Sequence, residues 1–275
     1  MLGATHTKVI MKMAELVGCG FAPDPIPAGL AMIFGNLLPD NLPVVGVSSE
    51  KSHDISRAKR LRNFMAPLGT GVIIHIYTDN LTHCNCVMNN GKYEDSVALK
   101  LGRELMEETS GRFMPLVEKF SKRSVPYTLH TVIELAADVL SAQEPVVDLI
   151  ECSWAASENR SADSFETVGE IYDIDCAKLI EGTKKFPPKS RPNPEALYSR
   201  RARAELFLRK FAPKDYDYSN VDVDRTEIIE LIESGEKMLA DGLTGLVDDF
   251  AGRILDAEPE LGDGISGILN SDGKI

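Results

Sequence analysis

The stretch Ile74-His75-Ile76-Tyr77-Thr78-Asp79-Asn80-Leu81-Thr82-His83 combines an apolar helical pattern with three chemically active side chains. His75, Asp79 and His83 follow one another at intervals of four residues. Side chains four residues apart on a helix are stacked neighbours, with about 6 Å between their Cβ atoms. The stretch therefore predicts a helix that carries a carboxylate between two imidazoles on one face.

This helix is predicted over residues 70–83. The apolar residues directly before His75 indicate that it is buried. Val72-Ile73-Ile74 would also suit the start of a strand. A buried carboxylate needs a charge partner. At this position Asp79 could bridge two cations, each of which would take one histidine. The same pattern also fits a helix with two surface histidines on either side of an aspartate.

Helical spacing of apolar residues recurs along the chain, and strict alternation is almost absent. The pattern predicts an all-α fold, with a metal-binding helical core over residues 1–145 and a helical extension over 146–275 packed on it. Lys184–Pro194 is expected to form a linker or surface loop, and the tail from about residue 262 is expected to fray. The clearest predicted helices cover residues 5–17, 28–38, 50–65, 70–83, 93–122, 127–142 and 225–256.

Composition is that of an ordinary globular protein, with 43% apolar and 26% charged residues among 275. The net charge of −12 disfavours binding to nucleic acid. Five cysteines fit no disulfide framework, although Cys84-Asn85-Cys86 could bind a metal. Because we recognise neither a signal peptide nor a run of about 18 apolar residues, we expect a cytoplasmic protein without a transmembrane segment.

The histidines are unevenly distributed, since none of the five lies in the last 145 residues. His130 and Glu134 repeat the spacing of four among apolar residues, and Asp138, on the same face, is equally compatible with exposure to solvent. His6 opens the first predicted helix, His53 lies in a polar segment, and Asp40 follows Pro39 in what is expected to be a turn that ends the second helix. Each has an ordinary structural explanation alone.

Together these side chains use every histidine of the chain and lie within residues 6–134. Imidazole and carboxylate ligands suit Zn²⁺, with Fe and Mn as alternatives. A cluster of two or three ions would need about this many ligands. The candidate metal ligands are His6, Asp40, His53, His75, Asp79, His83, His130 and Glu134.

The order of these motifs resembles that of the zinc-dependent phospholipase C and single-strand-specific zinc nuclease superfamily. An early histidine is followed by Gly35-Asn-Leu-Leu-Pro-Asp40, by a lone histidine, by the HxxxD helix with a further histidine, and by His130-xxx-Glu134. The resemblance covers residues 1–134. The gap of 47 residues between His83 and His130 is longer than is usual in that family.

The resemblance implies an all-α fold that holds three zinc ions. Carried over residue by residue, Asp40, His53, His75 and Asp79 would hold the first ion, and a second set, His83, His130 and Glu134, would hold the second. Asp79 would bridge to a third ion completed by His6, with the amine of Met1 as a further ligand.

The chemistry implied is hydrolysis of a phosphoester, because neighbouring cations acidify water and neutralise phosphate oxygens. Asp40 is the candidate catalytic residue that orients or deprotonates this water. The substrate would be a small-molecule or lipid-headgroup phosphoester.

Two alternatives remain open at the level of sequence. His53-Asp54 is the signature pair of HD-type phosphohydrolases, and a metal-stabilised helical scaffold or interaction protein without catalysis would use the same ligands. Phosphate loops of the P-loop and Rossmann types and the GxSxG motif are missing from the sequence. Arg200, Arg201 and Arg203 predict a solvated helix face, or a contact for an anionic partner.

Overall fold

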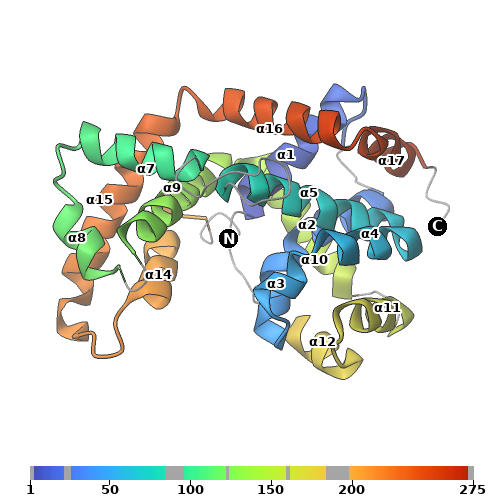
Figure 1. Cartoon of the computed structure of the whole chain (residues 1–275), viewed down its shortest axis with the longest axis horizontal. Helices are drawn as coiled ribbons and strands as arrows, with labels where there is room; N and C mark the ends of the chain where they lie inside the picture. Colours follow the sequence, from blue (N-terminus) through green and yellow to red (C-terminus); the bar gives the residue numbers. More distant parts are fainter. Residues whose placement is uncertain are drawn as a thin grey trace. The chain divides into compact units, whose positions relative to one another are not determined.

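A computed structural model describes residues 3–21, 26–83, 96–121, 124–158, 162–183 and 198–271. All regular structure in these ranges is helical, which confirms the predicted all-α class (Figure 1). Residues 84–95 and 184–197, which include the Cys84-Asn85-Cys86 motif and the expected linker, lie outside the described residues.

Most of the predicted helices are present, with changed boundaries. The helices are α1 (Gly3–Leu16), α2 (Pro27–Asn41), η1 (Leu42–Val45), α3 (Ser49–Ser52), α4 (Ile55–Phe64), α5 (Ala66–His83), α7 (Val97–Glu108), α8 (Met114–Lys119), α9 (Val125–Ser141), α10 (Glu144–Glu158), α11 (Ala162–Tyr172), α12 (Cys176–Thr183), α14 (Arg200–Phe211), η3 (Tyr218–Asn220), α15 (Val221–Leu239), α16 (Leu243–Ala257) and α17 (Glu260–Leu269).

Three expected boundaries were wrong. Pro39 does not end α2, which continues to Asn41, because a proline in the last turn removes only one backbone donor. The helix expected over 50–65 is split into α3 and α4, since Asp54 caps a new helix by accepting from the Ser56 N–H. The described part of the helix expected over 93–122 is split where Ser110 and Gly111 adopt left-handed φ angles of 51° and 70°.

The carboxyl-terminal tail is also more ordered than its composition suggested. Residues from 262 onward were expected to fray, but α17 covers Glu260–Leu269. Leu261, Ile265 and Ile268 are buried at helical spacing, which holds this helix in place despite its glycines.

The chain divides into two compact units. Unit 1 comprises Met1–Thr5, Asp79–Gln143 and Asn193–Leu246, and unit 2 comprises His6–Thr78, Glu144–Pro192 and Val247–Ile275. Each unit combines segments from both halves of the sequence. One boundary between the units falls inside the continuous helix α5.

In unit 2, glycines allow α2 and α5 to cross in close contact. A Cβ atom at Gly35 would lie 2.1 Å from the Leu68 carbonyl oxygen, and one at Gly71 would lie 2.0 Å from the Met32 carbonyl oxygen. Such distances exclude any side chain, so only glycine fits at these two positions. The helix α2 also packs on α10, where the rings of Phe34 and Trp154 meet edge-on with 5.2 Å between their centroids.

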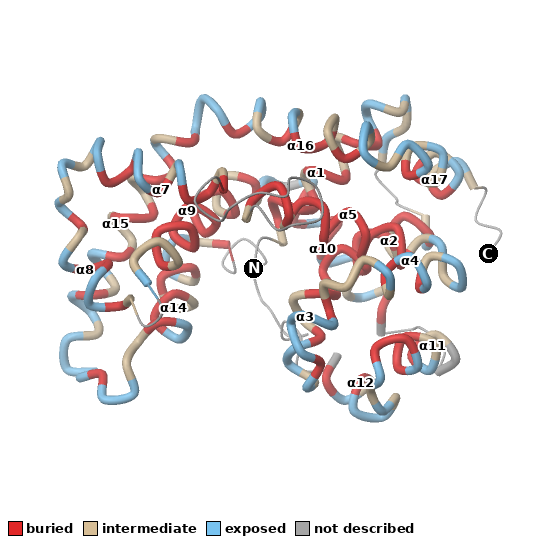
Figure 2. The backbone as a smooth tube through the Cα atoms, viewed as in Figure 1, coloured by how far each residue is buried: buried red, intermediate tan, exposed pale blue. Residues whose placement is uncertain are grey.

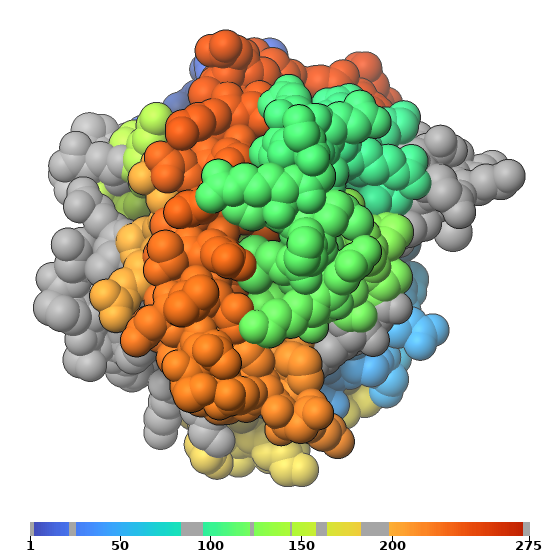
Figure 3. All heavy atoms as spheres, turned by 90° about the vertical axis from the view of Figure 1, so that its left-hand side faces the viewer, coloured from blue at the N-terminus to red at the C-terminus, as the bar shows by residue number. Residues whose placement is uncertain are grey.

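In unit 1, α9 is the central helix and packs against α7, α8, α14 and α15. Most of its residues are buried, as the tube in Figure 2 shows, and these include His130, Glu134 and Asp138. Figure 3 shows the face of this unit on which α7 and α8 lie against α15. Polar groups inside this helix bundle require specific partners.

One apolar helical stretch of the described residues, Pro27–Val45, is long enough to cross a membrane. It was not recognised from the sequence, where no run of sufficient length was expected. Because 61% of this stretch is buried inside the protein, it is no clear transmembrane segment.

Candidate metal centre

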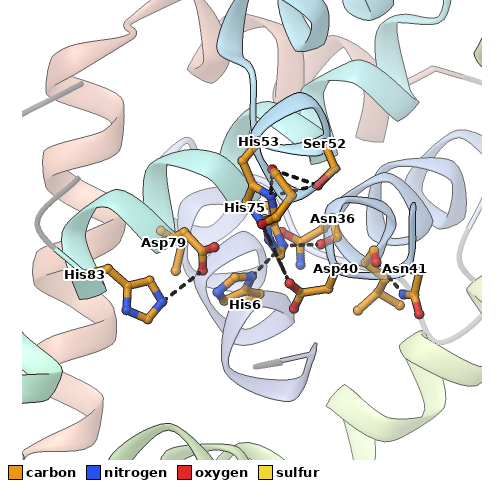
Figure 4. A network of polar contacts seen from close by, with 12 residues as sticks. His6, Asn36, Asp40, Asn41, Ser52, His53, His75, Asp79 and His83 are labelled. Atoms are coloured by element: carbon orange, nitrogen blue, oxygen red, sulfur yellow. Dashed lines mark hydrogen bonds and ion pairs between the residues drawn. The ribbon is translucent and has the colours of Figure 1, made fainter. Parts of the chain in front are cut away.

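The first candidate ligand group is built around His75 on α5. The Nε2 atom of His75 lies 3.3 Å from the Nε2 atom of His53, the residue that ends α3 (Figure 4). The Oδ1 atom of Asp40, in the last turn of α2, lies 4.0 Å from His75 Nε2 and 3.8 Å from His53 Nε2. Three segments far apart in sequence therefore direct one potential ligand atom each toward the same point.

The opposite ring nitrogens fix which atoms of these histidines can bind a cation. His75 Nδ1 lies 2.7 Å from the carbonyl oxygen of Asn36, and His53 Nδ1 lies 2.9 Å from the carbonyl oxygen of Ser49. Carbonyl oxygens only accept, so each Nδ1 is assigned the hydrogen and each neutral ring keeps its lone pair on Nε2. Hydrogen bonding of the distal nitrogen to a carbonyl is typical of histidines that bind metal.

Asp79 completes this group from the next turn of the same helix. Asp40, His53, His75 and Asp79 offer ligand atoms that all lie within 4.8 Å of one another. The spacing of His75 and Asp79 is set by α5 itself, as the sequence predicted. In contrast, the convergence of His53 and Asp40 depends on tertiary structure.

The second candidate group lies in unit 1 and comprises His83, His130 and Glu134, whose ligand atoms also lie within 4.8 Å of one another. His83 Nε2 is 2.9 Å from Glu134 Oε1 and 3.7 Å from Asp79 Oδ1. The rings of His83 and His130 meet edge-on with 5.0 Å between their centroids. Glu134 and His130 project from the buried centre of α9, one helical turn apart.

Electrostatics in the second group favour an ionised carboxylate. Burial alone would raise the pKa of Glu134, but nearby positive charge, chiefly that of His83, together with the hydrogen bond from His83 outweighs burial and holds this pKa well below its usual range. Burial alone would lower the pKa of His83, whereas the charges of Glu134 and Asp79 raise it to about 9. Burial lowers the pKa of His130 to about 4, against the attraction of Glu134. At neutral pH the metal-free group therefore presents a carboxylate at Glu134, a neutral imidazole at His130 and a protonated imidazole at His83.

His6 does not join either ligand group among the described residues. Its Nδ1 atom lies 2.7 Å from Nδ1 of His75, whereas Asp40 Oδ1 lies 4.0 Å from the other ring nitrogen, Nε2 (Figure 4). His6 therefore contacts the nitrogen of His75 that faces away from the ligand group. Its Nδ1 atom shares the Nδ1 hydrogen of His75 with the carbonyl oxygen of Asn36. The Met1 amine, the other ligand expected for a third ion, lies outside the described residues.

Three other charged residues have structural roles that the sequence did not reveal. Asp138 is completely buried; it accepts hydrogen bonds from the N–H groups of Ala4 and Thr5 and pairs with Arg203. The expectation that Arg200, Arg201 and Arg203 form one solvated face was wrong for Arg203, which is buried. Asp54, the aspartate of the HD pair, accepts from both the N–H and the hydroxyl of Ser56.

Comparisons with protein families, curated proteins and solved structures found no match to the chain.

Proposed function

We propose that this protein is a metal-dependent phosphoester hydrolase whose two ligand groups hold zinc-type ions, with Fe or Mn as alternatives. A third ion beside His6 is part of the proposal only through the resemblance to the zinc-dependent phospholipases C and nucleases. The proposal includes a small-molecule or lipid-headgroup phosphoester as the substrate and the cytoplasm as the location.

The observation that carries the proposal is the approach of His53 and His75. Two nitrogens bound to one tetrahedral zinc ion at about 2.0–2.1 Å lie about 3.3 Å apart. The two Nε2 atoms lie 3.3 Å apart, and the hydrogen bonds at Nδ1 direct a lone pair from each of them into the same space. Two facing lone pairs repel each other unless a cation lies between them. The donor set thus fits a zinc-type ion.

Bound ions would lower the pKa of water toward neutrality and neutralise the oxygens of a phosphate group. Asp40 is accessible to water and substrate, because its side chain is 28% exposed. The side chain of His75 is only 2% exposed. Its carboxylate would accept the proton of the attacking water, while the ester oxygen of the substrate leaves on the opposite side of phosphorus. Asp79 would remain a ligand, since it contacts His83.

The HD-type alternative receives less support from the structure. An HD site needs the aspartate beside the histidine to face the metal, whereas Asp54 is occupied as the amino-terminal cap of α4. The non-catalytic scaffold predicts the same ligands as the hydrolase and differs only in turnover. A measurement of turnover is therefore needed to separate the two.

The test measures hydrolysis of a panel of phosphoesters by the zinc-loaded protein and by its Asp40→Asn variant. We expect the variant to lose about 10²- to 10⁴-fold in kcat, the range for loss of a positioned proton acceptor. Asp54→Asn is the matched control, because this carboxylate is near in sequence but serves as a helix cap. Metal content is measured for each protein beside the rates.

Turnover by the parent that is lost in Asp40→Asn and kept in Asp54→Asn supports the hydrolase. Absence of turnover of every phosphoester by a parent that carries its metal would instead support the scaffold.

A further inference from the structure

Lys210 is an exposed lysine close to the second ligand group, and it lies in the last turn of α14. Its Nζ atom is 5.1 Å from the ring centroid of Tyr127 and 5.5 Å from that of Phe211. These distances are within the range of cation–π interactions. Two aromatic rings therefore hold the ammonium group over the first turn of α9.

Tyr127 connects this lysine to a candidate ligand. The rings of Tyr127 and His130 meet edge-on with 4.7 Å between their centroids and an interplanar angle of 87°. Residues 127 and 130 are three apart on α9, so the helix itself sets this contact. Tyr127 also packs on Phe211, which is buried and keeps the end of α14 against α9.

The positive charge of Lys210 is available for binding an anion. Many cations of unit 1 pair with carboxylates, as Lys119 does with Asp224 and Arg200 with Glu236. Within the described ranges, the ammonium of Lys210 has aromatic partners but no carboxylate within ion-pair distance. Tyr127 links this charge to the site, because its ring contacts both the Lys210 ammonium and the His130 ring.

We infer that Lys210 is a specificity residue that binds a phosphate oxygen of the substrate beside the second ligand group, positioned by the ring of Tyr127. This inference rests on the proposed function and names its substrate class: a phosphoester with a second negative charge, such as a phosphomonoester dianion. A lysine at this place repels a cationic headgroup, because like charges in a site oppose binding. In a protein of net charge −12, such a local cation is what would attract an anionic substrate.

The experiment compares two chromogenic esters that share a leaving group, p-nitrophenyl phosphate and p-nitrophenyl phosphorylcholine, with the zinc-loaded parent and Lys210→Ala. We expect kcat/KM for the dianionic ester to fall by about 10- to 100-fold, the range for loss of a charge-assisted hydrogen bond. For the zwitterionic ester we expect a change of less than about threefold. Lys214→Ala, which removes an exposed lysine from the following loop, is the matched control and should match the parent.

A second measurement needs no turnover. Inorganic phosphate is titrated into the zinc-loaded parent, Lys210→Ala and Tyr127→Ala, and we expect weaker binding in both variants with unchanged zinc content. Equal losses for the two esters, or equal phosphate binding in the parent and Lys210→Ala, would overturn the inference. If the parent binds phosphate through Lys210 but hydrolyses neither ester, nor any other ester of the panel, the proposed function fails while this anion site stands.

Discussion

Asp138 and Arg203 form an ion pair in the interior of unit 1, with 2.5 Å between Asp138 Oδ2 and Arg203 Nη2. Their side chains are 0% and 5% exposed. The other oxygen of Asp138 accepts from the N–H groups of Ala4 at 2.9 Å and Thr5 at 3.2 Å. One carboxylate on α9 thus holds both α14 and the first turn of α1 against α9. The same helix carries His130 and Glu134.

Replacement of Asp138 by Asn should therefore cost much of the stability of unit 1. Removal of one partner of a buried ion pair leaves the other charge uncompensated, which costs about 3–5 kcal/mol of unfolding free energy. Urea denaturation of the metal-free protein measures this loss. Asp222→Asn is the control, because the exposed pair of Asp222 with Arg225 should contribute less than about 1 kcal/mol. Equal effects of the two substitutions would show that the buried pair is not the anchor that we describe.

The pH dependence of the metal-free protein should reveal the proton on His83. Its pKa is raised to about 9 in the folded state from an ordinary value of 6.5. A raised histidine pKa stabilises the fold fully below pH 6.5, and this contribution is lost as the pH rises toward 9. Unfolding free energy measured from pH 6.5 to 9 in the presence of a chelator should fall in the parent. In His83→Gln this decrease of the unfolding free energy with pH should be absent. An unchanged decrease in the variant would contradict the raised pKa of His83.

The contact of α2 with α5 predicts a clear contrast between two glycines. In Gly71→Ala, the new Cβ would lie 2.0 Å from the Met32 carbonyl oxygen and 2.7 Å from the Asn36 backbone nitrogen. We expect a loss of about 1–3 kcal/mol from overpacking, together with weaker zinc binding, because Asn36 orients His75. Gly245→Ala has nothing within 4 Å of the new Cβ, so its stability should stay equal or rise by up to about 1 kcal/mol. Thermal unfolding and zinc titration of both variants check these outcomes.

Local spacing explains what could be predicted from the sequence. His75, Asp79 and His83 are separated by single helical turns, so their common face follows from the period of the helix. The approach of His53 and Asp40 to His75 followed from the order of motifs, not from any local pattern. It depends on how α2, α3 and α5 pack, and residue spacing contains no information about such packing.

Most features missed from the sequence depend on tertiary partners. Arg203 is buried because Asp138, 65 positions earlier in the chain, needs a charge partner inside the bundle. The contact of His6 with the distal nitrogen of His75 likewise depends on the packing of α1, and His6 as a ligand of a third ion stays a prediction. For α17, the signal was present in the spacing of Leu261, Ile265 and Ile268, and the glycine-rich composition concealed it.

Zinc stoichiometry at equilibrium tests the central claim most directly, since the claim is that two separate groups of side chains each bind an ion. The parent, His75→Gln, His130→Gln and the control Cys152→Ser, which alters an exposed free thiol, are dialysed against dilute zinc and analysed for metal. We predict at least two ions per chain in the parent and in Cys152→Ser, and one ion fewer in each histidine variant. Equal zinc content in the parent and in both histidine variants would contradict this claim.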